Sequence, residues 1–171
     1  VVQGSILGSL LFILYFNHIS KLSLNGTLYL YADDAILINE HNKNEQMEIK
    51  IKEDMREIIK YFNANKMILN SDKTNYIIFH AAATTYENIN EIEIENDWKI
   101  KRVHKLKYLG LILDEHLKWD EHVKVIESKL ASAAGILWKL RNRLSKEIKK
   151  KIYFTLFQTH LDYMNVVWGT A

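Results

Sequence analysis

Cysteine and proline are both absent from this chain of 171 residues. Without cysteine there is no disulfide framework and no zinc site built on thiolates, which is compatible with a reducing intracellular compartment. The apolar run from Ile6 to Phe16 is interrupted by Gly8 and Ser9 and falls short of the ~20 residues of a membrane span. No basic leader precedes it, so we expect no signal peptide. These absences predict an intracellular protein, nuclear or cytoplasmic, that is not secreted.

Hydrophobic residues make up 48% of the chain and charged residues 26%, which is typical of a foldable chain with a real core in one or two small domains. The net charge is only +2, but basic residues gather in two clusters. The first comprises Lys99, Lys101, Arg102, Lys105 and Lys107, and the second Lys139, Arg141, Arg143, Lys146, Lys149, Lys150 and Lys151. A basic surface attracts phosphate backbones. A solvated helix face is an equally good interpretation of either cluster alone.

The segment Tyr31-Ala32-Asp33-Asp34 lies between the apolar runs Leu28-Tyr29-Leu30 and Ala35-Ile36-Leu37-Ile38. Strands that are apolar at nearly every residue are typical of sheets buried on both faces, so we predict a buried hairpin from Leu28 to Ile38. Its tip would carry two carboxylates, and oxygen ligands suit the Mg²⁺ that phosphoryl transfer requires. Aspartate is also a favoured turn former. Because these carboxylates emerge from a buried sheet, the pattern favours metal-dependent nucleotidyl transfer.

Periodicity and turn residues predict the remaining elements. We expect helices over Ser9 to Ile19, Lys43 to Asn65, His122 to Arg141 and Lys146 to Trp168, and strands over Tyr76 to Phe79, Ile92 to Ile94, Trp98 to Ile100 and Lys107 to Asp114. The first helix should bury its apolar face, and the amphipathic second helix should pack beneath the sheet. Asn70-Ser71-Asp72 predicts a turn, and Ala81 to Asn90 a loop.

Four segments, in order, resemble the reverse transcriptases of non-long-terminal-repeat retrotransposons of the LINE or jockey type. The first is similar to the family's glutamine-glycine block, the second to its catalytic turn, the third to the block after the palm helix and the fourth to the block that follows. They are Val2-Gln3-Gly4-Ser5-Ile6-Leu7-Gly8-Ser9-Leu10-Leu11-Phe12, Tyr31-Ala32-Asp33-Asp34, Leu69-Asn70-Ser71-Asp72-Lys73-Thr74, and Tyr108-Leu109-Gly110 with Asp114, Leu117, Trp119 and His122. Together they span almost the whole chain.

The resemblance implies an α+β fold: a partial polymerase palm of antiparallel sheet and packed helices over residues 1–115, then a helical thumb-like region over residues 116–171. It also implies an RNA-directed DNA polymerase that joins dNTPs on an RNA template and a DNA primer, without a membrane partner. The fingers and the first part of the palm would belong to an upstream segment of the same polyprotein, which we expect to be missing because the chain begins at Val1 inside a motif.

The same resemblance implies roles for individual residues. Asp33 would be the principal ligand of two Mg²⁺ ions, for which Mn²⁺ could substitute, and Asp34 a supporting ligand. Tyr31 would lie near the primer end. Gln3 and Gly4 would contact template and nucleotide, Lys73 would lie near the triphosphate, and Tyr108-Leu109-Gly110 would form the hairpin that grips the primer. From the residues alone, a helix-leading turn at Gln3-Gly4 and a solvated Lys73 are alternatives, and Leu117, Trp119 and His122 favour core packing over chemistry.

Two departures from the family pattern bear on activity. Val2 and Ser9 stand where the family usually has proline, which should loosen the turn around Gln3-Gly4 and hints at mutational decay. The aspartate that precedes the glutamine-glycine block in the family has no counterpart here, so we expect the isolated chain not to polymerise DNA. A catalytically inert remnant that retains nucleic-acid binding is therefore an alternative. A metal-dependent hydrolase is another, although the sequence offers it no further ligands at convincing spacing.

Overall fold

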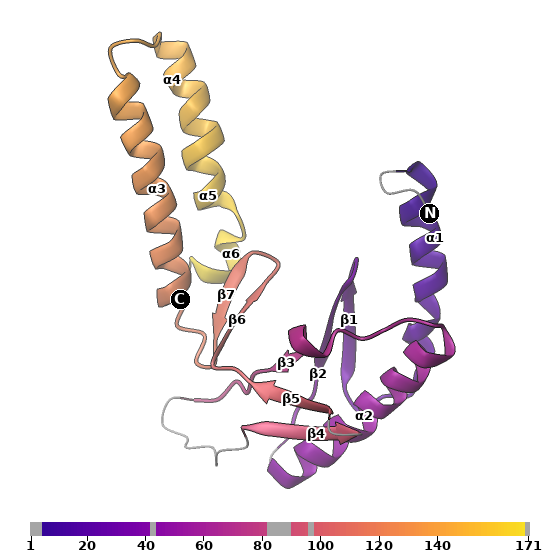
Figure 1. The fold of residues 1–171 in the computed structure, drawn as a ribbon. Helices are drawn as coiled ribbons and strands as arrows, with labels where there is room; N and C mark the ends of the chain where they lie inside the picture. The colour runs from indigo at the N-terminus through magenta and orange to yellow at the C-terminus, as the bar shows by residue number, and fades with distance from the viewer. Residues whose placement is uncertain (1–4, 42–43, 82–89, 96–97, 170–171) are drawn as a thin grey trace. The chain divides into compact units, whose positions relative to one another are not determined.

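The computed structural model describes residues 5–41, 44–81, 90–95 and 98–169. They form two compact units: the first lies within residues 1–76 and 88–102, and the second within residues 77–87 and 103–171 (Figure 1). Both units combine helices with antiparallel strand pairs, which confirms the α+β class. The proposed palm and thumb boundary after residue 115 follows from the family resemblance and stays a prediction. Within the described ranges, no helix has both the length and the apolarity needed to cross a bilayer.

The first unit begins with α1 (Ile6–Phe16) and the 3₁₀ helix η1 (Asn17–Lys21), which confirms a helix in this region. The expected burial of its apolar face is wrong, since Leu14 is 59% exposed and Leu10 is 53% exposed. A helix that is apolar on nearly every side cannot be covered by a single neighbour. Its C-terminal end is buried, where the Phe16 ring meets the Phe62 ring edge-on at 5.9 Å.

The predicted hairpin is present as β1 (Thr27–Tyr31) and β2 (Asp34–Ile38), which pair antiparallel with Tyr31 opposite Asp34. Leu28 and Leu37 pack against the core of the unit. Burial of both faces, however, is wrong, because Tyr29 on the opposite face is 55% exposed. In the described part of the chain this sheet has two strands, and the core covers one of its faces.

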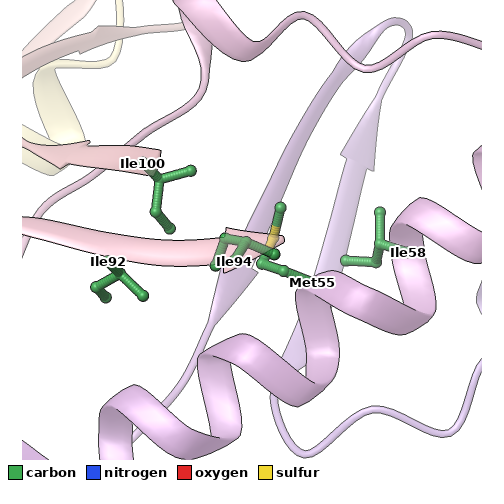
Figure 2. Packing of buried hydrophobic residues seen from close by; sticks show 5 residues of the cluster. All are labelled: Met55, Ile58, Ile92, Ile94 and Ile100. Carbon is green, nitrogen blue, oxygen red and sulfur yellow. The ribbon is translucent and has the colours of Figure 1, made fainter. Parts of the chain in front are cut away.

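Helix α2 (Asn44–Ala64) confirms the amphipathic prediction and packs against β4 (Glu91–Glu95), while Ile100 of β5 (Trp98–Arg102) joins the same core. Figure 2 shows the side chains that form this core: Met55, Ile58, Ile92, Ile94 and Ile100. In β4 the isoleucines alternate with exposed glutamates, as expected for a strand with one buried face. Strand β3 is limited to Asn75–Tyr76, shorter than the predicted strand, and pairs in parallel with β5.

The carboxylate of Asp54 joins α2 to the start of the hairpin. Asp54 is fully buried, and its Oδ1 accepts hydrogen bonds from the backbone N–H of Asn25 at 2.7 Å and the side-chain amide of Asn25 at 3.0 Å. Its Oδ2 accepts from the N–H of Gly26 at 2.9 Å. A Cβ on Gly26 would lie 2.6 Å from the Ile38 carbonyl oxygen, so no side chain fits there. Asp54 thus fixes the backbone immediately before β1.

We predict that Asp54→Ala lowers the free energy of unfolding by about 3 kcal/mol, because backbone N–H groups lose a charged acceptor. The matched control is Glu53→Ala, since Glu53 is exposed and accepts one hydrogen bond from the Asn25 amide at 3.2 Å. This control should cost less than about 1 kcal/mol. Urea denaturation followed by circular dichroism measures both, and equal losses in the two variants would refute the anchoring role.

The second unit contains an antiparallel hairpin, β6 (Lys105–Tyr108) and β7 (Leu111–Asp114). The single strand predicted from Lys107 to Asp114 is therefore wrong, whereas the hairpin that the resemblance implies at Tyr108-Leu109-Gly110 is present. Leu109 and Gly110 have φ angles of +44° and +83°, and two consecutive positive φ values close a two-residue hairpin turn. The chain reverses at this turn, whereas its apolar flanks alone indicate a continuous strand.

Helix α3 (Asp120–Leu140) confirms the first of the two C-terminal helices. The second is α4 (Lys146–Ile152), which continues through a π-helical segment, η3 (Tyr153–Gln158), into α5 (Thr159–Asp162). The predicted continuation to Trp168 is wrong, because Tyr163 adopts an extended ψ of 110° and α6 (Asn165–Trp168) begins after it. The indole N–H of Trp168 donates to the Tyr163 carbonyl at 2.9 Å, and this hydrogen bond joins α6 to the residue at the break.

Candidate active site and its supporting structure

The predicted metal-binding carboxylates lie at the tip of the β1–β2 hairpin. Ala32 and Asp33 form the two-residue loop, and Ala32 has a φ of +52°. Asp34 begins β2 directly opposite Tyr31, so their side chains share one face of the hairpin. Tyr31 is 63% exposed, and Asp33 and Asp34 are exposed as well. The tip therefore presents carboxylates beside an exposed aromatic side chain.

The donor atoms at this tip fit a hard divalent cation. Adjacent carboxylates supply oxygen ligands, and Mg²⁺ is commonly bound by one or two carboxylates together with waters and substrate phosphates. Among the residues that the structure describes, no third histidine, aspartate or glutamate completes a set with Asp33 and Asp34. The tip alone thus offers a partial ligand set, suited to a metal that substrate phosphates help to hold.

Lys73 ends the 3₁₀ helix η2 (Ser71–Lys73), which confirms the predicted turn. The side-chain oxygen of Asn70 accepts the N–H of Lys73 at 3.2 Å, and the Thr74 hydroxyl donates to the Asn70 carbonyl at 2.8 Å. These bonds fix the backbone while the side chain of Lys73 stays exposed. Its role at the triphosphate stays a prediction, as do the roles of Gln3 and Gly4, which lie outside the described residues.

The turn Tyr108-Leu109-Gly110, which the resemblance assigns to the primer grip, is held by a residue that sequence reasoning missed. The hydroxyl of Tyr163, at the break between α5 and α6, donates to the Leu109 carbonyl at 2.6 Å. A Cβ on Gly110 would lie 3.2 Å from Cε1 of the same tyrosine ring. Tyr163 therefore clamps the turn to the helical end of the unit.

We predict that Gly110→Ala lowers the free energy of unfolding by about 1–2 kcal/mol, since the left-handed backbone strains an L side chain and the added methyl presses on Tyr163. Gly135 is the matched control: it lies in α3 with open space around its Cα, so Gly135→Ala should be neutral or stabilising by up to about 1 kcal/mol. Thermal or urea unfolding measures both. A Gly110→Ala variant as stable as the parent would contradict the clamp.

Asp114, at the end of β7, closes the turn that leads into α3. Its carboxylate accepts the backbone N–H groups of His116 at 3.0 Å, Lys118 at 3.0 Å and Trp119 at 3.1 Å. Burial would raise the pKa of Asp114, but these hydrogen bonds outweigh it and lower the pKa. Leu117 and Trp119 have φ angles of +52° and +63° in this turn. Asp114 thus stabilises a strained backbone.

The core packing predicted after this turn holds for Trp119 and His122, which are buried, and is wrong for Leu117, which is 44% exposed. The left-handed backbone of Leu117 directs it out of the core. His122 lies between the rings of Trp119 and Trp168, with centroid distances of 6.3 and 5.6 Å. Its Nδ1 accepts the N–H of Ile112 at 3.4 Å, so a neutral imidazole joins α3 to β7.

Burial, with a smaller contribution from Lys129, lowers the pKa of His122. Unfolded His122 takes up a proton near pH 6.5 and folded His122 only at lower pH, so unfolding binds a proton in this window. We predict that stability falls as the pH drops from about 7 to 5, by up to about 1.4 kcal/mol per unit of pKa depression. His122→Asn keeps an acceptor near the Ile112 N–H without this titration and should flatten the slope. Urea titrations at both pH values compare the variants, and identical slopes would contradict the prediction.

The two basic clusters differ in their structural setting. Members of the first fall in both units, and Lys99 and Lys105 form ion pairs with Glu91 at 3.7 Å and with Glu121 at 3.2 Å. The second cluster lies in one unit, over the end of α3 and the start of α4. There the guanidinium of Arg141 stacks at 4.1 Å on the ring of Trp138, which is 67% exposed. This second cluster is the better candidate for contact with a phosphate backbone.

Comparison with known proteins supports the family resemblance. A model of the family described as reverse transcriptase (RNA-dependent DNA polymerase) matches residues 1–113. The chain is 28% identical, over its whole length, to a probable RNA-directed DNA polymerase from transposon X-element of Drosophila melanogaster. It is 25% identical, also over its whole length, to the RNA-directed DNA polymerase from mobile element jockey of Drosophila funebris.

A third similar protein is the retrovirus-related Pol polyprotein from type-1 retrotransposable element R1 2 of Nasonia vitripennis, with 27% identity over 82% of this chain. The chain spans 19% of the X-element and jockey proteins and 35% of the R1 protein. No solved structure matches it. The sequence is thus a fragment when measured against these relatives.

Proposed function

The chain belongs to the reverse transcriptase (RNA-dependent DNA polymerase) family, in its non-long-terminal-repeat retrotransposon branch, and we propose that it supplies the catalytic turn of an RNA-directed DNA polymerase. The observation that carries the proposal is the exposed Asp33-Asp34 tip beside Tyr31. The turn that presents these carboxylates to solvent is strained, because Ala32 has a positive φ. A polymerase needs metal ligands that a nucleic acid and a nucleotide can both reach.

In this proposal Asp33 is the principal metal ligand and Asp34 the supporting one. Bound Mg²⁺, or Mn²⁺ in its place, would supply activation of the primer hydroxyl and neutralise charge on the departing pyrophosphate. Tyr31 and Tyr29 share a face with Asp34, where exposed rings can pack against the primer. Lys73 contributes a cation for the triphosphate, and the clamped Tyr108-Leu109-Gly110 turn contacts the primer. RNA template, DNA primer and dNTP are the proposed partners.

A chimera provides the most direct test. The chain replaces the aligned segment of the X-element polymerase, which it matches over its whole length. Incorporation of dNTPs on an RNA template with a DNA primer is then measured for the chimera and for its Asp33→Asn variant. We expect Mg²⁺-dependent incorporation that Asp33→Asn lowers by at least about 10³-fold, a loss of roughly 4 kcal/mol in transition-state stabilisation.

Two controls separate chemistry from folding. Because Asp33 is exposed and makes no side-chain hydrogen bond to another described residue, Asp33→Asn should not lower the urea midpoint. Asp72→Asn removes another exposed carboxylate of the first unit, outside the hairpin, and should leave incorporation unchanged. A folded chimera whose incorporation survives Asp33→Asn would refute the role of Asp33. The chain by itself should not extend primers, since its described carboxylates give only a partial metal set.

A catalytically inert protein that binds nucleic acid is the second candidate, favoured by the exposed Trp138–Arg141 stack within the second basic cluster. An aromatic ring and cations together form a platform for a base and its phosphates. Binding of a primer-template that falls steeply with salt, is indifferent to Mg²⁺ and occurs in a folded but inactive chimera would favour this candidate.

A further inference from the structure

Three histidines and a glutamate gather where β7 ends, a cluster that local sequence spacing does not indicate. His80 lies after β3, His104 directly precedes β6, and Glu115 and His116 directly follow β7. The N–H of His80 donates to the Glu115 carbonyl at 3.1 Å, and the N–H of Glu115 donates to the His104 carbonyl at 3.2 Å. Backbone hydrogen bonds within the second unit therefore hold these distant segments together.

The backbone also sets the tautomers of two of these histidines. Nδ1 of His80 lies 3.0 Å from the Ala81 carbonyl oxygen, and Nδ1 of His116 lies 3.1 Å from the His80 carbonyl oxygen. A carbonyl oxygen can only accept, so both Nδ1 atoms carry hydrogen, and in a neutral imidazole the lone pair is then on Nε2. A ring N–H held by a backbone carbonyl is the usual support of a metal-binding histidine.

Both Nε2 atoms face one carboxylate. Nε2 of His80 is 3.7 Å from Oε2 of Glu115, and Nε2 of His116 is 3.8 Å from Oε1 of Glu115. These separations exceed hydrogen-bond length. They are close to the ~3.4 Å between two ligand atoms that each lie ~2.1 Å from a tetrahedral zinc ion. The three ligand atoms lie within 4.8 Å of one another, so small side-chain movements would bring all three within reach of one cation.

Neighbouring groups hold this arrangement. Nδ1 of His104 lies 2.8 Å from Oε2 of Glu115 and orients the carboxylate, while Asp114 accepts the N–H of His116 at 3.0 Å. The His80 and His116 rings meet edge-on at 4.7 Å. The side chains of His80 and Glu115 are only 10% and 19% exposed, which limits competition from water. The cluster is thus partly shielded and prearranged.

We propose that His80, Glu115 and His116 form a binding site for a divalent transition metal of the zinc class. Two imidazole nitrogens and one carboxylate suit Zn²⁺ rather than Mg²⁺, and the fourth position of a tetrahedral ion is left for water. This site differs in chemistry from the all-oxygen pair Asp33-Asp34 and does not depend on the proposed polymerase function. Its ion would tie the segment at His80 to the end of β7, next to the turn that Asp114 closes.

The test uses the untagged chain, stripped with a chelator and kept in millimolar Mg²⁺ so that hard oxygen sites are occupied. Calorimetric titration with Zn²⁺ should show one equivalent bound, and Co²⁺ should give the intense visible bands of tetrahedral coordination. His116→Gln and Glu115→Gln should weaken Zn²⁺ binding more than 100-fold and abolish the Co²⁺ bands. His104→Gln, which alters only the support of Glu115, should weaken binding by about 10–100-fold.

His18→Gln is the matched control, because His18 is exposed in η1 and lies outside the cluster; its Zn²⁺ binding should equal that of the parent. Far-ultraviolet circular dichroism in chelator verifies that each variant is folded. Equal binding by folded parent and His116→Gln would overturn the proposal. If the cluster variants fail to fold, X-ray absorption of the zinc-loaded parent decides: imidazole scattering from two histidines supports the site, and its absence, or the absence of bound zinc, overturns it.

Discussion

The geometry of the first unit depends on the hydrogen bonds that the buried carboxylate of Asp54 accepts from the backbone before β1. This carboxylate lies on the buried side of α2 and accepts the N–H groups of Asn25 and Gly26 just before β1. Since Leu28 and Leu37 also pack on the core beside α2, the hairpin is held at its base by hydrogen bonds and along one face by apolar contact. The hairpin tip extends from this base, so the position of Asp33 relative to the core derives from a side chain in another element.

In the second unit, polar side chains likewise hydrogen-bond to the backbone of turns. Asp114 accepts three backbone N–H groups in the turn before α3, and Tyr163 donates to the Leu109 carbonyl in the β6–β7 turn. In both turns non-glycine residues adopt positive φ, a conformation that costs about 1 kcal/mol per residue. A hydrogen bond to a charged group such as the Asp114 carboxylate contributes about 1.5–3 kcal/mol and a neutral one such as that of Tyr163 about 0.5–1.5 kcal/mol, enough to offset that cost. Polar side chains therefore determine where each unit turns.

The sequence predicted those features that arise from local pattern. Alternating isoleucines and glutamates predicted β4, and helical periodicity predicted α2. Acidic residues between two apolar runs predicted the hairpin tip. Features that depend on distant partners could not be predicted in this way. Nothing near Tyr163 indicates that its hydroxyl bonds to Leu109, and this bond accompanies the helix break. Asp54 did leave a signal, because it lies three residues after Ile51 and four before Ile58 on the apolar stripe of α2.

The hairpin tip differs from the other strained turns in its lack of stabilising side-chain hydrogen bonds among the described residues. Strain at Leu109 and Trp119 accompanies hydrogen bonds that join separate elements. Ala32 has the same positive φ, yet within the described residues the side chains of Asp33 and Asp34 bond to no partner. Two adjacent like charges on a strained turn destabilise the folded state, and proteins break local rules of this kind mainly at functional sites. The proposed metal role accounts for this tip: a cation would offset both charges, and a nucleotide bound to that cation would give the exposed tyrosines a surface to contact.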